Sequence, residues 1–251
     1  MATLAHVNSV AELRQKRLRD CRLTADRKLA TIEEAEAFLV DRGVLTLTQD
    51  SALPSLFAAT HEEAYKSELA HRPGVLALKV HRGKVLLCHQ AATRAIDPLA
   101  RAALAEADAA GDDGSRLVRH LKSAGPSKLD DVKDALGIEA TALRKVRERL
   151  ESVAAIVSRD IPIPGGKGIH THTSELARWD QVWNKPWKAN QEQALAELVL
   201  IGVRAAVLAH QDEVGKWFSW PVEWPLLADL IKTGRLQRPG PGYLAATSPQ
   251  H

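Results

Sequence analysis

The sequence contains only two cysteines, Cys21 and Cys88, and they do not form a Cys-x-x-Cys pair. It therefore supplies neither a disulfide framework nor the ligand set of a structural zinc site, and we expect a reducing compartment. No apolar run is long enough to span a bilayer, and residues 1–20 lack the apolar core of a secretory signal. These absences predict a cytoplasmic protein without a membrane partner.

Aromatic residues are scarce as well, at 4% of the chain. This scarcity favours several small modules over one large sandwich. A glycine-rich phosphate loop, a nucleophile elbow and a paired metal-ligand motif are all missing, which excludes nucleotide hydrolysis and acyl transfer and gives no cofactor to expect. A large excess of one charge is also missing, since the formal net charge is +3. Any nucleic-acid surface must therefore be local.

What the sequence does contain is a compact series of elements between residues 115 and 172. Apolar periodicity, glycine stops and strand alternation each mark their boundaries. The predicted elements are helices over 115–123, 127–136 and 139–150, a strand over 153–159, a turn-rich tip over 162–168 and a returning strand over 169–173. Three helices followed by a hairpin are the plan of a winged helix, which docks on duplex nucleic acid.

The third helix of this series is the most basic stretch of the chain. Its cations, which we expect to meet DNA phosphates, are Arg144, Lys145, Arg147 and Arg149. A solvated helix face would explain the same residues, because Glu148 lies among them.

The predicted hairpin carries three further candidates for DNA contact. Lys167 lies at the turn-rich tip, and His170 and His172 share one face of the returning strand, so each could reach phosphate or a groove. Two histidines in a His-x-His pattern could also bind a metal, but no carboxylate or cysteine stands at ligand spacing beside them. We therefore expect no metal here. The alternative for Lys167 is a solvent-exposed turn.

Two other stretches repeat parts of this plan. The first has a capping box at Thr31 and Glu34 and a hairpin whose tight turn carries Arg82 and Lys84, which we expect to contact DNA. The resulting division is a basic arm over 1–30, a first winged-helix-like unit over 31–112, a central winged helix over 113–187 and a C-terminal winged helix over 188–251. The predicted fold class is mainly α with small β-hairpins (α+β), arranged as three tandem winged-helix units.

Several segments together resemble a known family. They are SALPSLF at residues 51–57, the hairpin over 78–87, the central module and DEVGKWFSW at residues 212–220. In order and spacing they resemble the AlkZ and YcaQ group of bacterial DNA glycosylases, over nearly the whole chain from Thr31. The resemblance implies hydrolysis of the N-glycosidic bond of bulky N7-alkylated purines, or unhooking of crosslinks, in a channel formed by winged helices.

The best-known members of that group carry the chemistry on a Gln-x-Gln or Gln-x-Asp pair shortly before the segment that matches residues 51–57. The corresponding stretch here lacks Gln-x-Gln and offers Thr46, Thr48, Gln49 and Asp50. On a regular strand Thr46, Thr48 and Asp50 would share a face, where Asp50 could orient water and oppose positive charge on the sugar. The alternative is that the threonines only favour the strand, Gln49 and Asp50 begin a turn, and Ser51 caps the next helix.

Two functions of different classes follow from these patterns. The first is a monomeric DNA-repair glycosylase that acts on alkylated or crosslinked duplex DNA. The second is a non-catalytic DNA-binding protein or regulator, which the missing Gln-x-Gln favours. A winged-helix protein used only for protein contacts explains the basic helix less well.

Overall fold

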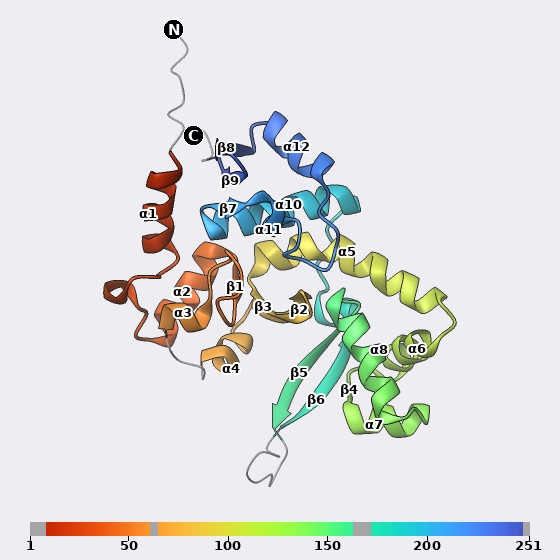
Figure 1. The fold of residues 1–251 in the computed structure, drawn as a ribbon. Coiled ribbons are helices and arrows are strands. Elements are labelled where there is room, and N and C mark those ends of the chain that lie inside the picture. The colour runs from red at the N-terminus through yellow and green to blue at the C-terminus, as the bar shows by residue number, and fades with distance from the viewer. Residues whose placement is uncertain (1–8, 61–64, 163–171, 248–251) are drawn as a thin grey trace.

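The computed structural model describes residues 9–60, 65–162 and 172–247. Within them lie three small antiparallel sheets, each of three strands, with the orders β1-β3-β2, β4-β6-β5 and β7-β9-β8 (Figure 1). In every sheet the strand that comes last in the sequence lies in the middle and pairs with the other two. The expectation of a mainly helical α+β protein with small hairpins is confirmed.

The same order of elements surrounds each sheet, namely helix, strand, two helices and a hairpin. The first unit contains α2 (Ile32–Arg42), β1 (Val44–Thr46), α3 (Leu56–Thr60), α4 (Tyr65–Ala70), β2 (Leu76–His81) and β3 (Lys84–Cys88). The middle unit contains α6 (Asp113–Ala124), β4 (Ser127–Lys128), α7 (Leu129–Leu136), α8 (Ala140–Ser152), β5 (Ile156–Pro162) and β6 (His172–Arg178). The third unit contains α10 (Gln191–Ala206), β7 (Ala209–His210), α11 (Gln211–Val214), α12 (Trp224–Lys232), β8 (Leu236–Gly240) and β9 (Tyr243–Ala246).

Local signals account for many of these boundaries. The Thr31 hydroxyl accepts a hydrogen bond from the Glu34 N–H at 3.2 Å, and Gly43, with φ +79°, ends the helix that follows. A capping box would also have the Glu34 carboxylate accept from the backbone N–H of Thr31. Here it accepts from the N–H of the preceding residue, Ala30, at 2.7 Å. In the middle unit Gly137, with φ +60°, ends α7 as expected.

A long helix, α5 (Gln90–Ala109), crosses the centre of the molecule and packs along α10 and α6 (Figure 1). Pro98 lies inside this helix, where a proline usually ends or bends one. Buried residues on both sides of the proline, such as Ile96 and Leu99, fix the helix against its neighbours. Their packing offsets the backbone hydrogen bond that proline cannot make. The main hydrophobic core extends from Val44 to Leu244 and takes residues from all three units.

The tryptophan-rich passage after β6 is tied to α5 by one buried carboxylate. Asp97, 0% exposed, accepts hydrogen bonds from the indole N–H of Trp179 at 2.8 Å, the backbone N–H of Trp187 at 2.8 Å and Nε of Arg101 at 2.7 Å. Trp179 begins the short helix α9 (Trp179–Val182) and is fully buried, so it packs in the core. Trp224, by contrast, is 47% exposed and lies under the Arg238 guanidinium.

The basic stretch near the N-terminus forms α1 (Val10–Asp20), which is capped by Ser9 and Glu12 and followed by a 3-10 turn (Ala25–Arg27). Its buried Leu13 joins a small core with Val207, Leu208 and Ala245 of the third unit. No helix in the described ranges combines the length and apolar character that a bilayer crossing requires.

Candidate functional site

The loop between β1 and α3 determines where the candidate catalytic residues lie. The β1 strand ends at Thr46, because the Thr46 N–H donates to the Pro54 carbonyl at 2.9 Å and its hydroxyl contacts the carbonyls of Thr48 at 3.0 Å and Pro54 at 3.2 Å. Of the two alternatives for residues 46–50, the regular strand is therefore wrong, and residues 47–50 form a bend. The Thr46 side chain is buried within the loop, whereas Thr48 and Gln49 are exposed.

Asp50 is the member of this set that meets other functional groups. Its carboxylate accepts a hydrogen bond from the Lys84 ammonium group, and its Oδ1 lies 3.5 Å from Nε2 of His81. Lys84 and His81 flank the tight turn between β2 and β3, so this hairpin supplies both partners. The Asp50 side chain is 24% exposed to solvent. Lys84, a predicted DNA contact, is thus also an ion-pair partner of the predicted catalytic carboxylate.

His81 links the first unit to the third. Its ring is buried, and Nδ1 lies 2.6 Å from the carbonyl oxygen of Trp217. Because a carbonyl only accepts, Nδ1 carries a proton and donates it. Beside it, Nε of Arg82 donates to the Lys216 carbonyl at 2.7 Å, so the second predicted DNA contact of this turn also holds the two units together.

The two ionisable groups of this contact are shifted in the same direction. Burial raises the pKa of Asp50, but the hydrogen bond and charge of Lys84, together with His81, lower the pKa of Asp50 more. Burial lowers the pKa of His81 more than the Trp217 carbonyl and the Asp50 charge raise it. At neutral pH the site therefore contains a carboxylate beside a neutral imidazole.

The buried His81 should make stability depend on pH. Its pKa in the folded protein lies below the ordinary value of 6.5, so the unfolded chain binds the proton more tightly. The free energy of unfolding should therefore fall as pH falls through that value, and it should fall more steeply between about pH 7 and pH 5 in the wild type than in His81→Gln. Urea denaturation at both pH values measures this. Equal steepness would contradict the expectation, and His120→Gln on α6, outside this contact, is the matched control.

Asp50 lines a pocket of about 510 Å³ between the first unit, the third unit and α1. Two arginines of α1, Arg14 and Arg17, form part of its wall. The third unit contributes Glu213, His210 and Tyr243. The imidazole of His210 lies edge-on to the Tyr243 ring, with the ring centroids 5.6 Å apart.

The backbone of Ala52 connects the three parts of this wall. The Ala52 N–H donates to Oε1 of Glu213, which also accepts from the indole N–H of Trp217 at 3.3 Å. The Ala52 carbonyl accepts from Arg17 at 2.9 Å. Two of the segments quoted for the family resemblance, residues 51–57 and 212–220, are thus in direct contact.

The cations of α8 do not share one environment. Arg144 and Lys145 are exposed, and Arg144 lies 3.9 Å from Glu148. Arg147 is largely buried and faces the buried carboxylate of Glu151 at 3.7 Å. Arg149 donates to Asp112 in the connection before α6 at 2.6 Å. The structure therefore leaves Arg144 and Lys145 as the cations of this helix most open to a partner.

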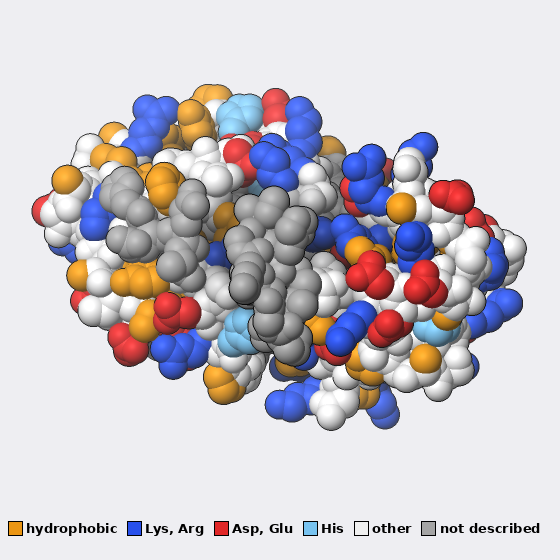
Figure 2. All heavy atoms as spheres, turned by 90° about the horizontal axis from the view of Figure 1, so that it is seen from below, with side chains coloured by type: hydrophobic (Ala, Val, Ile, Leu, Met, Phe, Trp, Pro, Cys, Tyr) orange, Lys and Arg blue, Asp and Glu red, His pale blue; other side chains and the backbone are white. Residues whose placement is uncertain are grey.

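The β5–β6 hairpin projects from the middle unit, and Figure 2 views the face from which it projects. Lysine and arginine side chains are interspersed there with aspartate and glutamate, over the part of the face that belongs to the middle unit. His172 pairs through its backbone with Pro162 at the described end of the hairpin. Lys167 and His170 lie outside the described residues.

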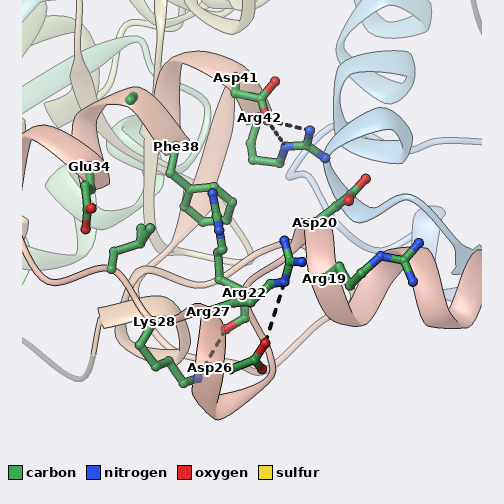
Figure 3. A pocket seen from close by; sticks show the side chains of 12 residues that line it. Arg19, Asp20, Arg22, Asp26, Arg27, Lys28, Glu34, Phe38, Asp41 and Arg42 are labelled. Atoms are coloured by element: carbon green, nitrogen blue, oxygen red, sulfur yellow. Dashed lines mark hydrogen bonds and ion pairs between the residues drawn. The ribbon is translucent and has the colours of Figure 1, made fainter.

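Two other hollows lie away from Asp50. A cleft of about 670 Å³ separates β2 from β5, and the buried Glu151 at its floor binds Lys79 at 2.6 Å and the Ser158 hydroxyl. A pocket of about 500 Å³ lies between the turn after α1 and α2, where Phe38 forms the floor and Arg19, Arg22 and Arg42 lie around it (Figure 3). Neither hollow contains a residue of the predicted catalytic set.

Sequence reasoning missed three groups of this site. His81 stands in the predicted turn and Glu213 in a quoted segment, but nothing local shows that both approach Asp50 and its loop. The Ala52–Glu213 bond spans 161 residues, and the His81–Trp217 bond spans 136. Arg14 and Arg17 belong to a basic run for which a solvated face is the usual explanation and DNA contact the alternative.

The arrangement of three units joined by α5 is similar to that of a solved structure, the Streptomyces sahachiroi DNA glycosylase AlkZ, with a TM-score of 0.59 and 10% sequence identity over 96% of this chain and 71% of that chain. The likeness is one of fold, and it supports the overall fold that the sequence resemblance implied. No protein-family model matches the sequence, and no curated protein matches it.

Proposed function

We propose that this protein binds duplex DNA and hydrolyses the N-glycosidic bond of a bulky N7-alkylated purine in the pocket that contains Asp50. The observation that carries the proposal is the position of Asp50. This carboxylate lies at the junction of two units of a DNA-glycosylase fold, and the neighbouring hairpin and helix supply Lys84, His81 and Arg17 around it.

The proposal treats each unit as a winged helix. Each sheet supports this assignment, because its first strand pairs with the last strand of the hairpin and two helices lie between them in sequence. The proposed division is 31–112, 113–187 and 188–251, with the residues before it as an arm. Exposed cations of α8, Arg144 and Lys145, support phosphate contact by the middle unit, and residues 163–171 would extend that contact.

The chemistry follows from the charge of the substrate. An N7-alkylated purine is cationic, so when the C1′–N9 bond breaks, its electrons stay with the base and the base leaves neutral. The sugar then carries positive charge, which an ionised Asp50 opposes. Water adds to C1′, and its proton passes to solvent through the carboxylate. Because the pKa of Asp50 is lowered, this residue is a weak base, and stabilisation of the cationic sugar is its principal role.

The direct test is base release. Purified wild-type protein is incubated with duplexes that carry an N7-methylpurine, a bulky N7 adduct or an N7 crosslink, and the released base is separated by chromatography. The proposal expects release from at least one duplex, together with binding to the undamaged duplex. If the protein binds these duplexes but releases a base from none of them, the proposed glycosylase activity is overturned. The second function, that of a non-catalytic DNA-binding protein, would then remain.

That second function has an observation of its own. The position two residues before Asp50 is Thr48 rather than glutamine, and the carboxylate of Asp50 is already bonded to Lys84. Binding to one specific undamaged sequence much more tightly than to others would support a regulator.

A further inference from the structure

We propose that Arg14 and Arg17 of α1 bind two DNA phosphates at the mouth of the Asp50 pocket. This inference rests on the proposed function only in that the ligand is DNA. It assigns the basic run near the N-terminus, for which the sequence left a solvated face and DNA contact open, to DNA contact.

The helix that carries these arginines is held in place from two sides. On one side Leu13 and the thiol of Cys21 pack on the third unit, and Cys21 Sγ donates to the Ala205 carbonyl at 3.4 Å. A Cβ added to Gly240 of β8 would lie 2.7 Å from Cγ2 of Val10, so helix and strand are in close contact. On the other side Arg17 is bonded to Ala52 of the first unit. Charges on such a helix are positioned before DNA arrives, which lowers the ordering cost of binding.

Among the residues that the structure describes, the arginines are bonded only to neutral oxygen atoms. One nitrogen of Arg14 donates to the Tyr243 hydroxyl at 2.9 Å, and its guanidinium lies 5.4 Å from the centre of that ring. One nitrogen of Arg17 donates to the Ala52 carbonyl at 2.9 Å. A guanidinium has five N–H donors, so each keeps donors for a phosphate.

Neighbouring charges on the same helix are arranged differently. Lys16 forms an ion pair with Asp20 at 2.6 Å and does not line the pocket. Arg19 lines the separate hollow between the turn after α1 and α2 (Figure 3). Arg14 and Arg17 are thus the two cations of α1 that line the Asp50 pocket without an ion pair to a carboxylate among the described residues.

The pocket lining suits one nucleotide displaced from the duplex with its flanking phosphates outside. Asp50 lies in the wall that would meet the sugar, and the Lys84 ammonium group offsets its charge. Because every phosphate has the same chemistry, contact by Arg14 and Arg17 should be independent of sequence and of damage.

Salt dependence of binding to an undamaged duplex tests this. The logarithm of affinity falls linearly with the logarithm of salt concentration, and loss of one phosphate contact reduces that slope by roughly 1. Arg14→Ala and Arg17→Ala should each reduce the slope by about 1, and the double variant by about 2. The controls Lys16→Ala and Arg19→Ala should reduce the slope by about 0.5 or less. Equal slopes in all variants would overturn the proposal.

Substitution by lysine separates charge from structure. Arg14→Lys and Arg17→Lys keep a phosphate-binding charge but change the bonds to Tyr243 and Ala52. They should retain most of the wild-type slope, and a slope as low as that of the alanine variants would show that the arginines act only through packing. The failures are distinguishable: wild-type protein that binds no DNA refutes the proposed function, while wild-type binding with unchanged slopes refutes the role of α1 alone.

Discussion

Asp50→Asn protein should release an alkylated purine at least about 100-fold more slowly than wild type. Asparagine has nearly the same shape, so the loop should keep its bonds through Thr46 and Ala52, but it carries no charge to oppose a cationic sugar. It also leaves the Lys84 ammonium without its ionic partner. Binding to undamaged duplex should therefore be as tight as wild type or tighter, while single-turnover base release falls.

The matched control for this prediction is Asp41→Asn. Asp41 is an exposed carboxylate on α2 that is bonded to Arg42 and lies in the hollow away from Asp50. Both carboxylates have a cationic neighbour, but only Asp50 lines the proposed site. A wild-type rate in Asp50→Asn would remove Asp50 from the chemistry, and an equal loss in both variants would point to a general charge effect.

Asp97→Ala should be the most destabilising of the substitutions proposed for this chain. Three donors lose their acceptor, and one of them, Arg101, is a cation. Asp97 is fully buried while Arg101 is 34% exposed, so the two N–H donors of Trp179 and Trp187 carry much of the loss, which together with the guanidinium should cost roughly 3–5 kcal/mol. For a protein of this size that corresponds to a fall in Tm of roughly 6–20 °C. Thermal unfolding followed by circular dichroism measures it.

Two variants keep this second prediction testable. Asp97→Asn retains one oxygen acceptor without charge, so its Tm should lie between those of Asp97→Ala and the wild type. This variant provides the measurement if Asp97→Ala does not fold. Asp108→Ala, on the same helix, removes an ion pair with Arg119. The Asp108 side chain is 33% exposed and the Arg119 side chain is 59% exposed. Because water screens such a pair, its loss should cost less than about 1 kcal/mol. Similar losses at Asp97 and Asp108 would contradict the role of burial.

Short-range features of the sequence predicted much of the fold. The glycine stops at Gly43 and Gly137 and the periodic apolar positions placed α2, α7 and α8 to within a few residues, because these signals act within a turn or two of helix. The hairpins were found for the same reason. By contrast, the helical turns before Pro98 depend on tertiary packing, because proline removes a backbone hydrogen bond and buried neighbours such as Ile96 and Leu99 hold the helix in place.

The candidate site was predicted only in part. Asp50 was identified from its place after β1, but the geometry assumed for it required the strand to continue. The strand stops because the Thr46 N–H bonds to Pro54, eight residues ahead. The partners of Asp50 come from the β2–β3 turn, and those of its loop from α1 and α11. No periodic pattern encodes such pairings, because they are made by tertiary packing.

The bond between Arg14 and Tyr243 spans 229 residues. During synthesis the N-terminal segment emerges first, at about 5–20 residues per second, so the partner of Arg14 follows roughly ten to fifty seconds later. Until then α1 lacks Val207, Leu208 and Ala245, against which its apolar side packs. A nascent chain that already contains Asp50 therefore has no closed pocket around it. The order of translation thus delays assembly of the site until Tyr243 and Ala245 have left the ribosome.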